Sequence, residues 1–186
     1  MQTPRTPTRP GPAAPARRLA GAKPLVVVIT GVAGSGKTTV GERLASALGW
    51  RFRDADSFHP ETNIAKMRAG VPLDDADRAP WLAAIRAYID AALAAGEPAI
   101  VTCSALRQSY RAALVADPCR VRLVQLAADS ATLRSRLERR TGHFMGPAML
   151  ESQLATLEPP GPEVLTLDAR QTPDALVATI RHTLSL

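Results

Sequence analysis

LVVVITGVAGSGKTT, residues 25–39, is the stretch that decides the fold of this chain. Its first part, residues 25–29, is an apolar run with the length of a buried strand. The residues that follow satisfy the pattern G-x-x-x-x-G-K-S/T, which is typical of a phosphate-binding loop set between a strand and a helix. The helix is indicated by an apolar stripe at helical spacing that ends before a glycine, namely Val40, Leu44, Ala47 and Leu48 before Gly49. Because strand, loop and helix follow in the required order, we interpret the segment as a phosphate-binding loop rather than a chance glycine-rich turn.

Each part of this loop has a physical role toward a triphosphate. Glycines allow backbone angles that other residues avoid, so successive N–H groups can face the phosphates, and the positive end of the helix adds to the attraction. Lys37 is expected to bridge the outer phosphates and to act in catalysis, and Thr38 to hold Mg²⁺ through its hydroxyl. The nucleotide-binding residues expected in the loop are Gly31, Val32, Ala33, Gly34, Ser35, Gly36, Lys37, Thr38 and Thr39.

Length and composition favour one globular domain. The chain has 186 residues, of which 46% are hydrophobic and 22% charged, as in an ordinary globular protein. No apolar run approaches the roughly 20 residues that cross a bilayer, so an integral membrane protein is excluded. Cys103 and Cys119 are the only cysteines, and they show no metal-ligand spacing and no secretory context. A reducing, cytoplasmic compartment is therefore expected.

The net charge of +6 comes almost entirely from one end of the chain. Residues 1–23 hold five of the 23 basic residues and none of the 17 acidic ones, which leaves the rest nearly neutral. The sequence therefore predicts no nucleic-acid-binding face on the body. Rich in proline and poor in bulky apolar residues, residues 1–23 are expected to form a disordered basic tail before a single domain at 24–186. An organelle transit peptide is the alternative, but the prolines disfavour the amphipathic helix that it needs.

Strand and helix patterns alternate along the rest of the chain. Further strands are expected at residues 50–53, 98–102, 120–126 and 164–167. Helical patterns lie between and after these strands, at residues 61–70, 82–93 and 106–116. Three more helical patterns follow: one begins near residue 130, one ends near residue 157, and one begins after the cap residue Thr172. This alternation predicts an α/β fold, a three-layer, doubly wound parallel sheet of about five strands. Such a sheet binds its ligand beyond the carboxyl ends of the strands.

A phosphate-binding loop alone does not choose among GTPases, motor ATPases and small-molecule kinases. The chain lacks the Asn-Lys-x-Asp guanine reader, and the strands at 98–102 and 120–126 end without a carboxylate. Asp54 and Asp56 instead follow the second strand, as in small kinases. We assign Asp54 to hydrated Mg²⁺ and Asp56, as catalytic base, to the attacking hydroxyl, with both on an extended segment. The alternative is that both face solvent in a polar turn.

Several segments resemble the gluconokinases, which belong to the shikimate-kinase-like branch of P-loop kinases. They are DADSFHP at 54–60, NIAKM at 63–67, GVPLDDADRAPWL at 70–82, CSALRQSYR at 103–111 and RTGHFMGPAMLESQLATLEPP at 140–160. The resemblance implies transfer of the γ-phosphoryl group of ATP to the 6-hydroxyl of D-gluconate. It also implies a P-loop fold like that of the nucleoside-monophosphate kinases, with a mobile lid at about 140–150, and a cytoplasmic homodimer.

Gluconate is a chain of hydroxyls that ends in a carboxylate, so its site needs several hydrogen-bonding side chains and a fixed cation. Arg78 and Lys66 are candidates for binding the substrate. The alternative for Arg78 is an ion pair with a neighbouring aspartate, and the alternative for Lys66 is a side chain that is simply solvated. Cys103 is expected to be packed rather than nucleophilic, and Trp81 is expected to pack. The candidate substrate-binding residues are Asp56, His59, Asn63, Lys66, Arg78, Arg107, Tyr110 and, in the lid, His143.

Arginines precede the lid segment and can stabilise charge on the transferring phosphoryl group. Arg136 is the catalytic candidate and Arg139 a candidate nucleotide contact. The sequence alone leaves open which of Arg136, Arg139 and Arg140 stabilises the charge on the phosphoryl group. A solvated charged helix face is the alternative for each. The lid departs from the family, which commonly has proline directly after His-Phe-Met, whereas this chain has Gly146 before its proline.

Two other functions fit parts of the sequence. A related kinase of another small hydroxy acid, such as shikimate, would have the same fold and loop. A non-catalytic nucleotide-binding or nucleic-acid-binding protein that works through its basic tail would need neither paired aspartates nor an acceptor site.

Overall fold

The apolar run expected to form a buried strand is β1 (Val26–Thr30), and all five of its residues are buried. In the computed structural model, which describes residues 25–139 and 147–186, β1 lies in the middle of a parallel sheet with strand order β2-β3-β1-β4-β5. Each strand is close to its predicted position. The other strands are β2 (Arg51–Asp54), β3 (Ala99–Thr102), β4 (Val121–Ala127) and β5 (Leu165–Asp168).

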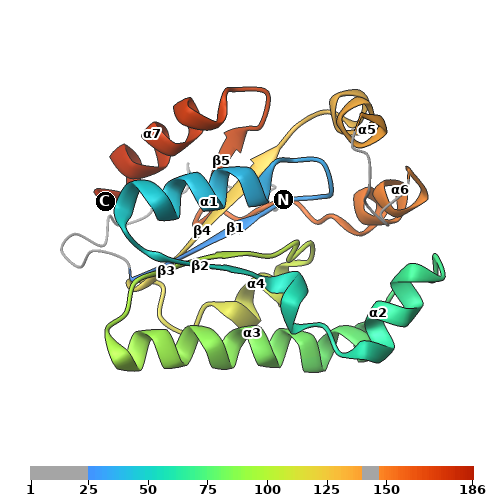
Figure 1. Cartoon of the computed structure of the whole chain (residues 1–186), viewed down its shortest axis with the longest axis horizontal. Coiled ribbons are helices and arrows are strands. Elements are labelled where there is room, and N and C mark those ends of the chain that lie inside the picture. The colour runs from blue at the N-terminus through green and yellow to red at the C-terminus, as the bar shows by residue number, and fades with distance from the viewer. Residues whose placement is uncertain (1–24, 140–146) are drawn as a thin grey trace, which may run out of the picture.

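Helices cover both faces of the sheet. Figure 1 shows α1 and α7 along one face and α3 and α4 along the other, with α2, α5 and α6 near the end toward which the strands run. The predicted three-layer, doubly wound α/β fold is therefore confirmed. The helices are α1 (Lys37–Leu48), α2 (Glu61–Arg68), α3 (Asp75–Ala95), α4 (Gln108–Leu114), α5 (Ser130–Glu138), α6 (Pro147–Thr156) and α7 (Pro173–Leu184).

Alternate side chains of β1 pack into two hydrophobic cores, one on each face of the sheet. Val26 and Val28 pack in the cluster that holds the buried residues of α3 and α4, whereas Val27 and Ile29 pack in the cluster that holds those of α1 and α7. All four side chains are fully buried. Burying a side chain of this size stabilises the fold by about 1.5–3 kcal/mol, so β1 fixes both helical layers relative to the loop that follows it.

The α3 helix begins earlier than its apolar stripe indicated. The stripe predicted a helix at 82–93, but the structure has a helix from Asp75, so residues 75–81 are helical rather than loop. Asp74 and Asp77 form a capping box, in which the Asp77 N–H donates to Asp74 Oδ1 (2.8 Å) and the Asp74 N–H donates to Asp77 Oδ2 (3.1 Å). This reciprocal pair satisfies two N–H groups at the helix start. The early start brings Arg78 and Trp81 to the carboxyl end of the sheet.

The loop after β1 requires glycine at two positions. Gly31 has φ of 137°, and a Cβ there would stand 2.6 Å from the carbonyl oxygen of Leu126 on β4. Gly36, the residue before α1, has φ of 89° and no side chain to cover the first N–H groups of the helix. The loop therefore turns tightly against β4 and presents the amino end of α1 to whatever binds there.

Replacing Gly41 with alanine is expected to destabilise the fold, because this residue lies where α1 packs on the sheet. A Cβ at Gly41 would stand 2.7 Å from Thr102 Cγ2 and 2.8 Å from Phe52 Cε2. Overpacking costs about 1–3 kcal/mol, and the better helix propensity of alanine offsets up to about 1 kcal/mol of it. Urea titration of Gly41→Ala should show a free energy of unfolding lower by about 1–2 kcal/mol.

Ser46→Ala, on the exposed side of the same helix, is the matched control and should change the free energy of unfolding by less than about 0.5 kcal/mol. A Gly41→Ala protein as stable as the parent would contradict the close approach of α1 to β2 and β3.

None of the helices in the described ranges is both long enough and apolar enough to cross a membrane. The predicted tail at 1–23 and most of the predicted lid, residues 140–146, lie outside the described residues. Both therefore stay predictions.

Candidate active site

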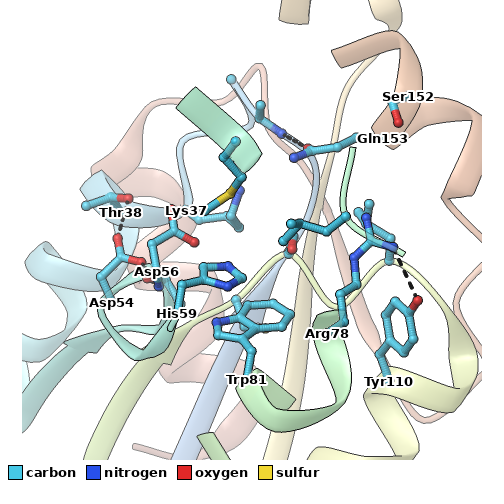
Figure 2. A pocket seen from close by; sticks show the side chains of 18 of the residues that line it. Lys37, Thr38, Asp54, Asp56, His59, Arg78, Trp81, Tyr110, Ser152 and Gln153 are labelled. Carbon is cyan, nitrogen blue, oxygen red and sulfur yellow. Dashed lines mark hydrogen bonds between the residues drawn. The ribbon is translucent and has the colours of Figure 1, made fainter. Parts of the chain in front are cut away.

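A cavity of about 360 Å³ lies at the carboxyl end of the sheet, where the predicted loop and acceptor segments meet. Its wall combines the phosphate-binding loop, the turn after β2, the start of α3, the loop after β3, and parts of α5 and α6 (Figure 2). Many of the residues expected from the sequence line it, namely Ala33, Gly34, Gly36, Lys37, Thr38, Thr39, Asp54, Asp56, His59, Arg78, Tyr110 and Arg136.

One end of the cavity carries fixed positive charge. Lys37 donates from Nζ to the carbonyl oxygen of Val32 (3.0 Å), which folds its side chain back over the loop. Arg136 donates to the carbonyl oxygens of Ala169 (2.7 Å) and Gly34 (3.5 Å), so its guanidinium joins the loop to the segment after β5. Together with the N–H groups at the start of α1, these cations form an anion-binding end.

Thr38 and Asp54 stand together beside Lys37. The Thr38 hydroxyl donates to Asp54 Oδ2 (3.2 Å), and the other carboxylate oxygen of Asp54 accepts from the Asp56 N–H (3.1 Å). Hydroxyl and carboxylate oxygens are suitable ligands for Mg²⁺, which also takes water and substrate phosphates. Among the described residues no group of three or more His, Cys, Asp or Glu side chains could hold a metal. Thr38 and Asp54 therefore offer two oxygen ligands to an ion that also takes water and phosphates.

Asp56 lies in a turn and not on the extended segment expected from the sequence. Residues 55–58 form a single 3₁₀ turn, η1 (Ala55–Phe58), that begins at the capping side chain of Asp54. Trp81 Nε1 donates to the carbonyl oxygen of the buried Ala55 (2.8 Å), and this hydrogen bond connects the turn to α3. The prediction of an extended segment was wrong because the Asp54 carboxylate can accept from a backbone N–H two residues on, a local bond that bends the chain. Asp56 nevertheless lines the cavity.

His59 is held on the floor of the cavity as a neutral ring. It stacks on Trp81, with ring centroids 4.5 Å apart and planes within 6°. Burial, and secondarily the charge of Arg78, lowers the pKa of His59 to about 4. Asn63 Nδ2 donates to the Asp77 carbonyl oxygen (2.7 Å) and lies 3.4 Å from His59 Nδ1. Since that Asn63 nitrogen is a donor, His59 Nδ1 accepts, and the ring proton is on Nε2.

Arg78 reaches the cavity from α3 and is part of a charged cluster with Asp75, Arg107 and Tyr110. It donates to the Tyr110 hydroxyl (3.5 Å) and lies 4.0 Å from the Asp75 carboxylate. Tyr110 and Arg107 both donate to Asp75, and these bonds, the Tyr110 bond first, lower the pKa of Asp75. The guanidinium thus approaches Asp75, as the alternative role required, and Arg78 also lines the cavity, so its binding to substrate stays a prediction.

Some expected substrate-binding residues are held by protein partners away from the cavity wall. Asn63 is buried between α2 and α3, and Lys66 donates from Nζ to both carboxylate oxygens of Asp77 (2.6 and 2.8 Å). Arg107 is paired with Asp75. The structure gives these residues structural contacts and does not bring them to the cavity wall.

The remaining expected residues have other positions. Gly31, Val32 and Ser35 lie in the loop without lining the cavity, and Arg139 is the cap residue directly after α5. His143 lies outside the described residues. Their assigned roles stay predictions.

Sequence reasoning missed several residues of the cavity wall. Cys103 behaves as expected, since it is buried and its burial raises the pKa of the thiol to about 12. Ser152 and Gln153, on α6, had a signal, because they form the Ser-Gln pair inside the family-like segment at 140–160. The same signal was present for five more, which lie inside the other family-like segments: Met67, Pro72, Leu73, Ser104 and Leu106. Of the missed residues, only Thr102 and Leu137 lie outside every segment that carried the resemblance.

Comparison with known proteins identifies the family of the chain. A family model described as an AAA domain matches residues 26–160. A gluconokinase of Gluconobacter oxydans is 46% identical over 165 residues, which span 87% of this chain and 93% of that protein. The thermoresistant gluconokinase of Escherichia coli is 38% identical over 83% of this chain and 90% of its own.

Solved structures show the same relationship. The crystal structure of a gluconokinase from Sinorhizobium meliloti superposes with a TM-score of 0.78 at 41% identity, covering 89% of this chain and 94% of that one. A shikimate kinase from Aquifex aeolicus, at 17% identity and a TM-score of 0.53, shares the fold alone. The chain has a phosphate-binding loop beside a cavity, and it is 38–46% identical to these gluconokinases along most of its length. The chain therefore belongs to the gluconokinase family of P-loop kinases.

Proposed function

We propose that this protein transfers the γ-phosphoryl group of ATP to the 6-hydroxyl of D-gluconate, giving 6-phospho-D-gluconate and ADP. The observation that carries the proposal is a cavity whose wall includes both Lys37 and Thr38 of the phosphate-binding loop and Asp56, His59 and Arg78 of the acceptor segments. The identity with curated gluconokinases supports the choice of gluconate.

The donor end binds ATP through the loop N–H groups, Lys37 and Arg136. In this proposal Lys37 and Arg136 face the negative charge that develops on the transferring phosphoryl group, so they stabilise the transition state more than the bound substrate. Thr38 and Asp54 are the residues that would hold Mg²⁺, directly or through water. When bound, Mg²⁺ neutralises phosphate charge and aligns the outer phosphates.

The acceptor end binds gluconate between Asp56 and Arg78. In the view of Figure 2 the His59 ring lies between these two side chains. Arg78 is the fixed cation for the gluconate carboxylate, with the Tyr110 hydroxyl beside it at 3.5 Å. His59 donates from Nε2 to a hydroxyl along the chain, and Asp56 accepts the proton of the attacking 6-hydroxyl.

The test is turnover by the purified protein with ATP and Mg²⁺ and a panel of sugar acids that includes D-gluconate and shikimate. ADP release coupled to NADH oxidation gives the rate, and mass spectrometry identifies the phosphorylated product. Gluconate should be the preferred acceptor by kcat/KM. Turnover of shikimate without turnover of gluconate would replace gluconate as the substrate and leave the kinase chemistry in place.

The proposal includes two properties that rest on the family resemblance, a homodimer and a cytoplasmic location. Light scattering after size-exclusion chromatography measures the first as molar mass. A mass equal to one 19.7 kDa chain at micromolar concentration would count against the dimer.

A matched pair of substitutions at His59 separates its hydrogen bond from its ring stack. Phe at this position keeps an aromatic ring on Trp81 and removes the Nε2 donor, whereas Gln keeps a donor and removes the stack. One hydrogen bond contributes about 0.5–1.5 kcal/mol, so His59→Phe should raise KM for gluconate by about 2- to 10-fold, with little change in KM for ATP. His59→Gln should stay closer to the parent. Steady-state kinetics with each substrate varied in turn measure both.

His182→Phe on the exposed side of α7 is the control for the same exchange and should leave both KM values unchanged. A larger effect on KM for ATP than on KM for gluconate would move His59 from the acceptor to the donor site.

The pH dependence of gluconate binding follows from the same environment of His59. Because the pKa is lowered to about 4, the ring is neutral from there upward and should not contribute a step to kcat/KM between pH 5.5 and 8. An inflection near pH 6.5 that His59→Gln removes would contradict a neutral donor.

A further inference from the structure

Gln153 on α6 contacts the phosphate-binding loop across 120 residues of sequence. Its Oε1 accepts a hydrogen bond from the Ala33 N–H at 2.7 Å. A backbone N–H can only donate, so the amide oxygen of Gln153 must face the loop. The other end of the amide, Nε2 with its two N–H groups, is thereby left for the cavity that Gln153 lines.

The contact lies at the outer-phosphate end of the loop. The N–H held by Gln153 and the carbonyl that accepts from Lys37 Nζ belong to the same peptide unit, between Val32 and Ala33. In loops of this kind the lysine reaches the β- and γ-phosphates, whereas the backbone N–H groups of the loop cradle the α- and β-phosphates. The Ala33 N–H is held by Gln153 instead. One peptide unit therefore separates Gln153 from the side chain that serves the γ-phosphate.

Packing fixes the position of α6 against the loop. Leu150, one turn before Gln153, is fully buried in a cluster with Val32, Ala33 and Leu133. On the outer side Glu151 accepts from Arg134, which ties α6 to α5. In Figure 2 Gln153 and Ser152 lie across the cavity from Thr38 and Asp54. Gln153 thus approaches the phosphate site from the side opposite the candidate metal ligands.

We infer that Gln153 is a substrate-contact residue for the γ-phosphoryl group of ATP, which it binds through Nε2 while Oε1 holds the 32–33 peptide in place. This inference rests on the proposed function and adds a neutral donor to the cations Lys37 and Arg136. A neutral amide supplies a directed hydrogen bond without adding charge to an already basic end of the cavity. The consequence is selectivity for a triphosphate over a diphosphate, because ADP has no γ-phosphoryl group to accept the bond.

The test compares binding of Mg²⁺·ADP with binding of an Mg²⁺·ATP analogue whose β–γ bridge resists hydrolysis, measured by calorimetry on the full chain without gluconate. Gln153→Glu keeps an oxygen for the Ala33 N–H but replaces the donor by a negative charge. It should weaken the triphosphate at least 10-fold and ADP less than about 2-fold. Gln153→Leu removes both the Nε2 donor and the oxygen that accepts from the Ala33 N–H, without adding charge, and should lower the triphosphate-to-diphosphate affinity ratio by about 3- to 10-fold.

Gln171→Glu, an exposed glutamine after β5, is the control for the charge change and should leave that ratio unchanged. Equal losses for both nucleotides in Gln153→Leu and Gln153→Glu would overturn the inference and leave Gln153 as a residue that only shapes the loop. Unchanged affinities for both would overturn it as well. Failure of the parent protein to phosphorylate gluconate would instead count against the proposed function, since the binding ratio is measured without an acceptor.

Discussion

Lys37→Ala is expected to lower kcat by about 10²-fold or more while the protein stays folded. Lys37 is held by the Val32 carbonyl at 3.0 Å, so its ammonium is fixed beside the loop without a nucleotide. A preorganised charge of this kind stabilises the transition state without reorganisation at the moment of transfer. Steady-state kinetics at saturating ATP and gluconate give kcat, and circular dichroism checks the fold.

Arg43→Ala is the matched control, because Arg43 lies on the same helix with its side chain half exposed and paired to Asp174. Loss of an exposed ion pair of this kind changes stability by about 0–1 kcal/mol and should leave kcat within about 2-fold. A Lys37→Ala protein with kcat within about 3-fold of the parent would remove Lys37 from the transfer step and with it the interpretation of the loop as a catalytic site.

The position of the phosphate-binding loop was predictable because its parts are contiguous in sequence. A loop flanked by a strand and a helix carries its own geometry, so its place between β1 and α1 follows from spacing alone, whereas the phosphate contacts of residues 31–39 stay a prediction. The sheet was predictable for a similar reason, since each apolar run is local and buried on both faces. What the sequence missed depends on contacts between distant segments.

The acceptor side shows this limit. Lys66 and Arg107 look like ligands for an anionic substrate, but their partners, Asp77 and Asp75, lie 11 and 32 residues away at the start of α3. The start of α3 was itself missed for two reasons. Its capping box uses two aspartates, Asp74 and Asp77, instead of the usual Ser or Thr with Glu or Gln, and Pro80 inside the helix is a residue that commonly breaks helices. Once residues 75–81 are helical, the aspartates take up these cations and Arg78 remains on the cavity wall.

The last part of the family-like segment is explained only by the fold. Glu158 Oε2 accepts from the N–H of Gln108 (2.6 Å), and Arg111, which is almost fully buried, donates to the carbonyl oxygens of Leu106 and Pro159 (both 2.9 Å). These bonds join the segment after α6 to the loop after β3. The loop carries Ser104 and Leu106 of the cavity wall and α6 carries Gln153, so these bonds connect two parts of the wall although Glu158 and Pro159 do not line the cavity themselves.

Asp56→Asn is expected to lower kcat by about 10²- to 10³-fold and to leave ATP binding nearly unchanged. The exchange keeps the size of the side chain and removes its ability to take a proton from the 6-hydroxyl, a role needed in the transfer step rather than in binding. The variant keeps the bond of the Asp56 N–H to the Asp54 carboxylate and the bond of Trp81 to Ala55, so the turn should survive. Calorimetry with the ATP analogue and steady-state kinetics measure the two effects separately.

Two comparisons make this result specific to Asp56. Asp90→Asn, on the exposed side of α3 where Asp90 pairs with Arg86, makes the same chemical change and should leave kcat within about 2-fold. Asp54→Asn should raise the Mg²⁺ concentration needed for half-maximal rate, whereas Asp56→Asn should not, because Asp54 is the carboxylate that accepts from the Thr38 hydroxyl. An unchanged kcat in Asp56→Asn would assign proton acceptance to another group, and a raised Mg²⁺ requirement would place Asp56 on the metal side of the cavity instead of the acceptor side.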